Sequence, residues 1–211
     1  MPASLIYSFV TFLVILDPVG VAVIFAAMTD NTPAAARRGI AWRGILIAGI
    51  LILVFAAGGQ QLLDALGISM RAFRLAGGVL LFLLATDMVF ARDSGIRKPT
   101  IPEQVETEHR QDISVFPLAF PLLAGPGALT SVVLLIGRAH GPIEVAGVIA
   151  SLLAALALTF AALLLARHVM RVLGVTGANV IGRVLGVVLA ALAAQYVLDG
   201  LGLGGGALVG G

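Results

Sequence analysis

The sequence contains no cysteine and few charged residues. Lys, Arg, Asp and Glu make up 11% of its 211 residues, whereas soluble domains average about 25%. The absence of cysteine excludes disulfides, thiolate chemistry and cysteine-based metal sites. The net charge of +2 gives no indication of a nucleic-acid partner. With 60% hydrophobic residues, the chain cannot cover its surface with polar groups, so we expect a lipid bilayer to be its solvent.

Long stretches with little or no charge predict six membrane-spanning helices. A bilayer core of about 30 Å requires about 20 apolar residues per helix. Such stretches cover approximately 5–28, 40–61, 71–91, 114–137, 143–166 and 179–199. We therefore expect an all-α integral membrane protein that crosses the membrane several times.

A polar segment, residues 92–112, divides the chain into two groups of three spans. It contains charges of both signs and two prolines, which is typical of a solvated linker. The predicted organisation is a first three-helix unit at 1–91, this linker on the cytoplasmic side, a second unit at 113–199 and a glycine-rich tail at 200–211.

The distribution of basic residues predicts the orientation. Connections after spans one, three and five contain Arg37, Arg38, Arg43, Arg92, Arg97, Lys98, Arg110, Arg167 and Arg171. The opposite connections contain only Arg71, Arg74 and Arg138. Because basic residues concentrate on the cytoplasmic side, both termini are expected outside the cytoplasm of a bacterial inner membrane.

The two halves share weak internal similarity. An Arg-x-x-Gly pattern occurs at 74–77 and again at 183–186, and Pro18 corresponds to Pro126 at an offset of 108 residues. A duplicated unit with three spans must insert in opposite orientations. The pattern therefore predicts two inverted repeats, a recurring architecture of secondary transporters.

Helix-breaking residues interrupt spans one and four near their middle. They are Asp17, Pro18 and Gly20 in the first half, and Gly125, Pro126 and Gly127 in the second. Proline and glycine can end one half-helix and begin another, whose free N–H groups attract anions. Two matched breaks indicate a substrate site in the membrane. The alternative is that these prolines only kink two packed helices.

Several polar residues accompany the breaks. An acid within a span is costly, so Asp17 is a candidate for pairing with helix-end N–H groups, or for binding solute or a coupling cation. Thr130 can line the same site or bond its own backbone. Arg74, Arg183 and Asp87 are candidates for contacts between the halves or for coupling, or they simply extend to the membrane surface. Gly182-x-x-x-Gly186 is a helix-packing pattern.

The sequence around these breaks resembles the MarC family, also known as UPF0056. The resemblance rests on VTFLVILDPVGVAVIFAAMT, FPLAFPLLAGPGALTSVVLL and the two Arg-x-x-Gly patterns, and it covers nearly the whole chain. Its most specific part is Ala-Gly-Pro-Gly-Ala at 124–128. The family includes archaeal transporters of glycine and alanine, so the resemblance implies transport of small neutral amino acids.

The sequence thus favours a secondary transporter or exporter of a small neutral solute, coupled to a proton or sodium ion. No cofactor or metal site is expected. A structural or regulatory membrane protein without transport is the main alternative. An intramembrane enzyme is less favoured, because the three histidines fall in expected loops and no span carries paired acids or a metal-binding pattern.

Overall fold

The computed structural model describes residues 2–90 and 113–203, and these residues form helices joined by short turns, without a β-strand among them. The predicted linker at 92–112 and the tail beyond residue 203 lie outside the described residues. In chain order the elements are α1 (Pro2–Leu16), α2 (Pro18–Met28), α3 (Ala34–Ala65), α4 (Met70–Phe90), η1 (Ser114–Leu123), α6 (Pro126–Arg138), α7 (Pro142–Leu164) and α8 (Ala166–Leu201).

The helices are long and apolar enough for five or six membrane spans. Five segments qualify separately, including Ser4–Met28, which joins α1 and α2. The bent pair of η1 and α6 gives a sixth span if the two are counted together. The expectation of an all-helical protein that crosses the membrane several times is confirmed.

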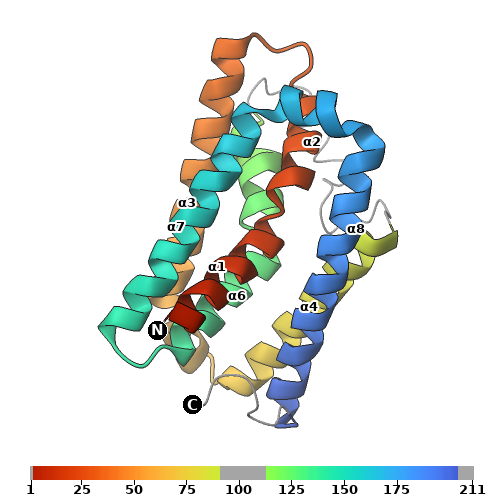
Figure 1. The fold of residues 1–211 in the computed structure, drawn as a ribbon. Helices are drawn as coiled ribbons and strands as arrows, with labels where there is room; N and C mark the ends of the chain where they lie inside the picture. The colour runs from red at the N-terminus through yellow and green to blue at the C-terminus, as the bar shows by residue number, and fades with distance from the viewer. Residues whose placement is uncertain (1, 91–112, 204–211) are drawn as a thin grey trace.

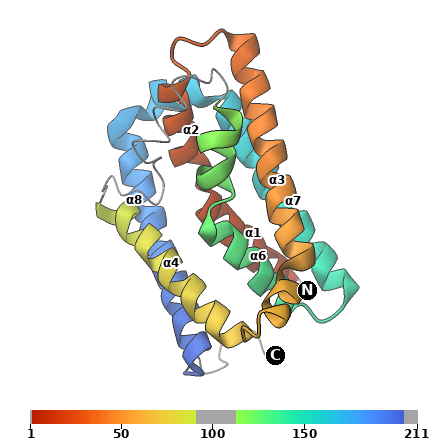
Figure 2. The same ribbon diagram turned by 180° about the vertical axis from the view of Figure 1, so that it is seen from behind.

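The broken elements occupy the centre of the molecule. In Figures 1 and 2, α1, α2 and α6 lie between α3 and α7 on one side and α4 and α8 on the other. Burial follows this arrangement. In the most apolar 18-residue stretch of Ser4–Met28, 56% is buried inside the protein, against 22% in that of Thr176–Leu201. The central elements thus face protein, whereas the outer helices leave most of their surface for lipid.

The two halves run in opposite directions. α1 begins and α8 ends at the same end of the molecule, and the elements η1–α6, α7 and α8 each run opposite to α1–α2, α3 and α4 (Figure 1). Two groups of three spans that enter the membrane in opposite orientations require this arrangement. The inverted-repeat relationship itself stays a prediction.

Helix α8 begins earlier and ends later than the sequence indicated. The connection expected between 166 and 179 is helical, with one interruption at Gly174, where φ is 59°. The placement of His168 in a loop was therefore wrong, since it lies in the first turn of α8. Apart from glycines this segment contains no helix breaker, so it continues the helix. Gly200 and Leu201, assigned to the tail, also belong to α8.

Glycines bring α4 and α8 into close contact. A Cβ atom on Gly78 of α4 would lie 2.9 Å from the backbone nitrogen of Val197 and 3.0 Å from the carbonyl oxygen of Ala193. On α8, a Cβ on Gly186 would lie 2.9 Å from the Cβ of Met88. The predicted packing pattern is therefore half confirmed, because Gly182 faces open space.

We predict that Gly78→Ala destabilises the protein by about 1–3 kcal/mol, because the added methyl meets backbone that cannot rotate away. Gly182→Ala is the matched control. It places a methyl in open space within a helix, so its stability should stay unchanged or rise by up to about 1 kcal/mol. Unfolding of the detergent-solubilised variants measures both. Equal stability of the two variants would contradict the close packing of α4 on α8.

Candidate functional site

Asp17 is the single residue between α1 and α2. Its backbone is left-handed, with φ 45° and ψ 66°, and it is the only non-glycine residue with positive φ in the described part of the chain. Asp tolerates this conformation better than most residues because its short side chain can bond locally. Its Oδ1 accepts a hydrogen bond of 3.1 Å from the N–H of Gly20. The acid therefore caps α2, and its side chain is buried with the residue only 2% exposed.

The sequence of this break explains its geometry. Pro18 occupies the first position of α2, where the missing N–H costs nothing. Gly20 must lack a side chain, because a Cβ there would collide with the carboxylate of Asp17. Backbone hydrogen bonding continues across the break. The amide of Asp17 donates to the carbonyl of Leu13 at 3.1 Å, and the carbonyl of Asp17 accepts from the amide of Val21 at 2.9 Å. Asp17, Pro18 and Gly20 thus form one local unit.

The second break is longer and less regular. In η1, Phe116 and Phe120 have extended backbone angles, with φ near −130°. Each precedes a proline, and a following proline disfavours the helical region. The hydrogen bonds at the two ends of η1 span five residues, from Leu118 to Ile113 and from Ala124 to Ala119. The two Phe-Pro pairs are a signal that the sequence interpretation overlooked.

Helix α6 begins directly after this irregular segment. Gly125 is its N-cap and Pro126 its first residue, and among the described residues no side chain caps it. The amides of Ala128 and Leu129 both donate to the carbonyl of Gly125, at 3.0 and 3.1 Å. Because Pro126 has no N–H, the amide of Gly127 is the one donor of this first turn without a backbone acceptor in the helix. A Cβ on Gly125 would lie 2.5 Å from the carbonyl oxygen of Pro121, so glycine is required there too.

A pocket adjoins the start of α6. It is lined by Ile15 of α1, Leu80 and Leu84 of α4, and residues 121–123 and 125–128 of the second break. A Cβ on Gly127 would lie 3.6 Å from Ile15, which is two residues before Asp17. The end of α1 therefore lies against the start of α6. Gly125, Pro126 and Gly127 line the pocket, whereas Asp17, Pro18, Gly20 and Thr130 do not.

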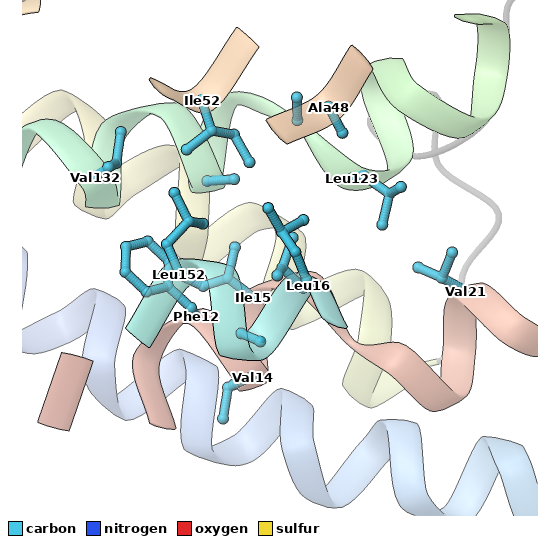
Figure 3. Close-up of a cluster of buried hydrophobic side chains, with 14 of the residues drawn as sticks. Phe12, Val14, Ile15, Leu16, Val21, Ala48, Ile52, Leu123, Val132 and Leu152 are labelled. Atoms are coloured by element: carbon cyan, nitrogen blue, oxygen red, sulfur yellow. The ribbon is translucent and has the colours of Figure 1, made fainter. Parts of the chain in front are cut away.

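The core around this point is apolar. Figure 3 shows side chains of α1 in contact range of those from α3, α6 and α7, including Phe12, Ile15, Leu16, Ile52, Val132 and Leu152. Among the buried residues of the described chain, Asp17 is the only acidic or basic one.

The other predicted residues lie away from the pocket. Thr130 is buried and packs against Gly77 of α4. Arg74 is half-buried in the first half of α4, Asp87 is half-buried in its last turn, and Arg183 is exposed on α8. The structure thus places Arg74 and Arg183 on the two paired outer helices, but it does not bring them to the breaks.

An ion pair between Arg138 and Asp199 escaped the sequence interpretation. It joins the end of α6 to the end of α8, and Gln195 donates a further hydrogen bond of 2.8 Å to Asp199. In the sequence analysis, Arg138 was counted among the basic residues of a connection and Asp199 was given no role. A charge of each sign at the same end of neighbouring spans is the signal that identifies such a pair.

Comparison with known proteins agrees with this architecture. Residues 3–203 match the family described as MarC family integral membrane protein. The chain is 33% identical over 197 residues to UPF0056 membrane protein MJ0972 of Methanocaldococcus jannaschii, covering 93% of this chain and 86% of that protein. It is 34% identical over 198 residues to UPF0056 inner membrane protein YhgN of Escherichia coli K12, covering 94% and 96%. No solved structure matches the chain.

The helical fold and the apolar surface define a multi-pass integral membrane protein. Within that class, the chain belongs to the MarC family, as the match over nearly its whole length establishes. The resemblance inferred from the sequence is therefore confirmed.

We predict that the cap at Asp17 depends on shape and not on charge. Asp17→Asn keeps both the acceptor and the tolerance of positive φ, so stability should change by only a few tenths of a kcal/mol. Asp17→Ala removes the acceptor and should cost about 1–2 kcal/mol. Gly20→Ala should also destabilise, because its methyl displaces the carboxylate.

Gly58→Ala serves as the control for the last variant, because a Cβ at Gly58 of α3 meets open space. Unfolding midpoints in detergent rank the four proteins. Equal losses for Asp17→Asn and Asp17→Ala would show that the charge, and not the cap, stabilises this break.

Proposed function

We propose that this protein is a secondary transporter or exporter of small neutral amino acids of the glycine and alanine class, working by alternating access. One observation carries the proposal: the start of α6, which no side chain caps, lines a pocket beside the end of α1, two residues before the acid that caps α2. Helix interruptions that meet inside a membrane protein are typical of transporter sites, because irregular backbone is tolerated there only where protein or a cavity covers it.

In this proposal the two breaks are discontinuities of spans one and four near mid-membrane, and the halves are inverted repeats. Support comes from their positions, since each break lies in the first span of its half, and from the opposite directions of the halves (Figure 1). Both breaks also lie in central elements with many buried residues.

The chemistry of the site suits a zwitterion. The amide of Gly127 and the positive end of α6 attract the solute carboxylate. The carboxylate of Asp17 attracts the ammonium group once it releases the N–H of Gly20. Small residues at 124–128 leave room for a small side chain only. Bulkier amino acids would meet the leucines that α4 contributes to the pocket.

Asp17 is also the proposed carrier of the coupling ion. A buried carboxylate that alternates between a cap and a solute contact can exchange a proton or bind sodium as it does so. We assign the protein no catalytic role, because transport leaves every bond of the solute intact, and recovered solute should be chemically unchanged.

We predict that purified protein in liposomes takes up labelled glycine or alanine under a proton or sodium gradient, and that Asp17→Asn reduces the rate at least tenfold. This variant keeps the cap, so the loss should occur with folding intact. Asp64→Asn, an exposed acid at the end of α3, is the matched control and should transport normally.

Uptake is followed as radioactivity retained in the liposomes. If folded wild-type protein moves neither amino acid under either gradient, the proposal fails, and a structural or regulatory role replaces it. If Asp17→Asn transports as well as Asp64→Asn, the site is assigned to the wrong residue.

The proposed orientation places both termini outside the cytoplasm of the bacterial inner membrane. Cysteine labelling can test it directly, because the chain has no native cysteine. Asn31 and Leu66 are exposed in the turns at opposite ends of α3. We predict that a membrane-impermeant maleimide labels Leu66→Cys in intact cells but labels Asn31→Cys only after lysis. The reverse pattern would invert the topology.

A further inference from the structure

The first part of α8 is separate from the part that can span the membrane. Helix α8 is interrupted at Gly174, where φ is 59° and ψ is −176°. The apolar span begins only after this point, at Thr176. Residues 166–173 therefore form a helical segment of their own, which we call the surface helix. In Figure 1 it crosses the top of the molecule, from the end of α7 to the upright part of α8.

One side of the surface helix rests on the protein. Nη2 of Arg167 donates a hydrogen bond of 2.8 Å to the backbone carbonyl of Asp30, in the turn between α2 and α3. Ala166 is fully buried and Leu173 is half-buried. The segment is thus held at the end of the molecule where α2 and α7 end and α3 begins. Because three apolar spans end or begin there, this level corresponds to a surface of the membrane.

The side that faces away from the protein is basic. Arg167, His168 and Arg171 are exposed, and Arg171 follows the other two by four and three residues, so the three share a face. The sequence has no acid between residues 166 and 198. The hydrogen bond of Arg167 goes to an uncharged carbonyl, which leaves its positive charge in place. Among the described residues, none forms an ion pair with Arg171.

Exposed apolar side chains lie beside this basic face. Leu165, the residue before α8, and Val172 are 56% and 78% exposed, and their separation of seven residues places them on one side of the helix. A helix that lies in the plane of the membrane surface has this composition. Its apolar side chains enter the boundary of the acyl chains, while its arginines reach the phosphate groups.

We propose that the surface helix binds the headgroups of anionic phospholipids. Guanidinium groups form paired hydrogen bonds with phosphate oxygens. In phosphatidylcholine the choline cation cancels the phosphate charge, whereas phosphatidylglycerol keeps its negative charge. A basic segment at the membrane surface therefore attracts the anionic lipid more strongly. Asp30, the acid of the adjoining turn, is outnumbered, because Arg37 and Arg38 at the start of α3 add two cations at this end.

Quenching of a fluorescent label by brominated phospholipid tests the proposal. The chain has no native cysteine, so Val172→Cys provides a single labelling position on the surface helix. Ile143→Cys, exposed at the start of α7 and therefore at the opposite end, is the control position. The full-length protein is placed in vesicles of phosphatidylcholine with a minority of phosphatidylglycerol, and one of the two lipids is brominated on its acyl chains. Quenching then reports which lipid surrounds the label.

Phosphatidylglycerol should quench the label at position 172 at least twofold more than its share of the lipid predicts. At position 143 quenching should follow that share. Added sodium chloride should weaken the excess, because salt screens exposed charges. In the Val172→Cys protein, Arg171→Gln should remove most of the excess, whereas Arg71→Gln, an exposed arginine at the start of α4, should preserve it. Equal unfolding midpoints in detergent show that both variants are folded.

Three results would overturn the proposal. If neither brominated lipid quenches the label at position 172, the surface helix does not lie on the bilayer. If quenching there follows the lipid composition, the helix does not select anionic headgroups. If Arg171→Gln and Arg71→Gln behave alike, the basic face is not responsible. Because the measurement involves no solute, a failure of the proposed transport leaves it unaffected.

Discussion

Lipid offers no hydrogen bonds to a backbone amide that an interrupted helix leaves free, and this constraint governs the centre of the protein. An interruption inside a span must be capped by the chain itself or covered by protein or a cavity. The first break is capped by the chain itself, because Asp17 takes the left-handed conformation and accepts a hydrogen bond from the amide of Gly20. Pro18 contributes by removing one further donor. The break thus leaves few polar groups of its own exposed, at the cost of a buried carboxylate.

The second break borders a pocket and is not capped by a side chain of the described residues. Pro126 again removes one donor, and the carbonyl of Gly125 serves two amides. The two breaks are therefore chemically unequal: one contributes a carboxylate and the other a backbone amide. The zwitterionic solute that we propose has one charge of each sign and so matches this inequality.

The sequence predicted the spans well, because a stretch without charge is visible residue by residue. Proline and glycine act on their own local backbone, and the structure ends one helix and begins the next at the positions that they mark. That these are breaks of spans near mid-membrane stays a prediction. The sequence left open whether Asp17 pairs with helix-end N–H groups, because that depends on one side-chain torsion and on the absence of a Cβ at Gly20. The pairing of Arg138 with Asp199 was also missed. The sequence places both charges at the same end of their spans, but 61 residues separate them and only the packing of α6 near α8 brings them together.

The outer helices connect the pocket to the ion pair between Arg138 and Asp199. The glycine contacts join α4 and α8 backbone to backbone, so neither can shift far without the other. This pair meets the centre in two places along α4: Leu80 and Leu84 line the pocket, and Arg74 faces the ion pair of α6 and α8. Residues 74, 77, 78, 81 and 84 recur every three or four positions, so they share one helical face. In the alternating access that we propose, one group of helices moves against another. Any displacement of α4 and α8 that widens the pocket must therefore also change the surroundings of Arg74, which links the charge at the outer end to the volume at the breaks.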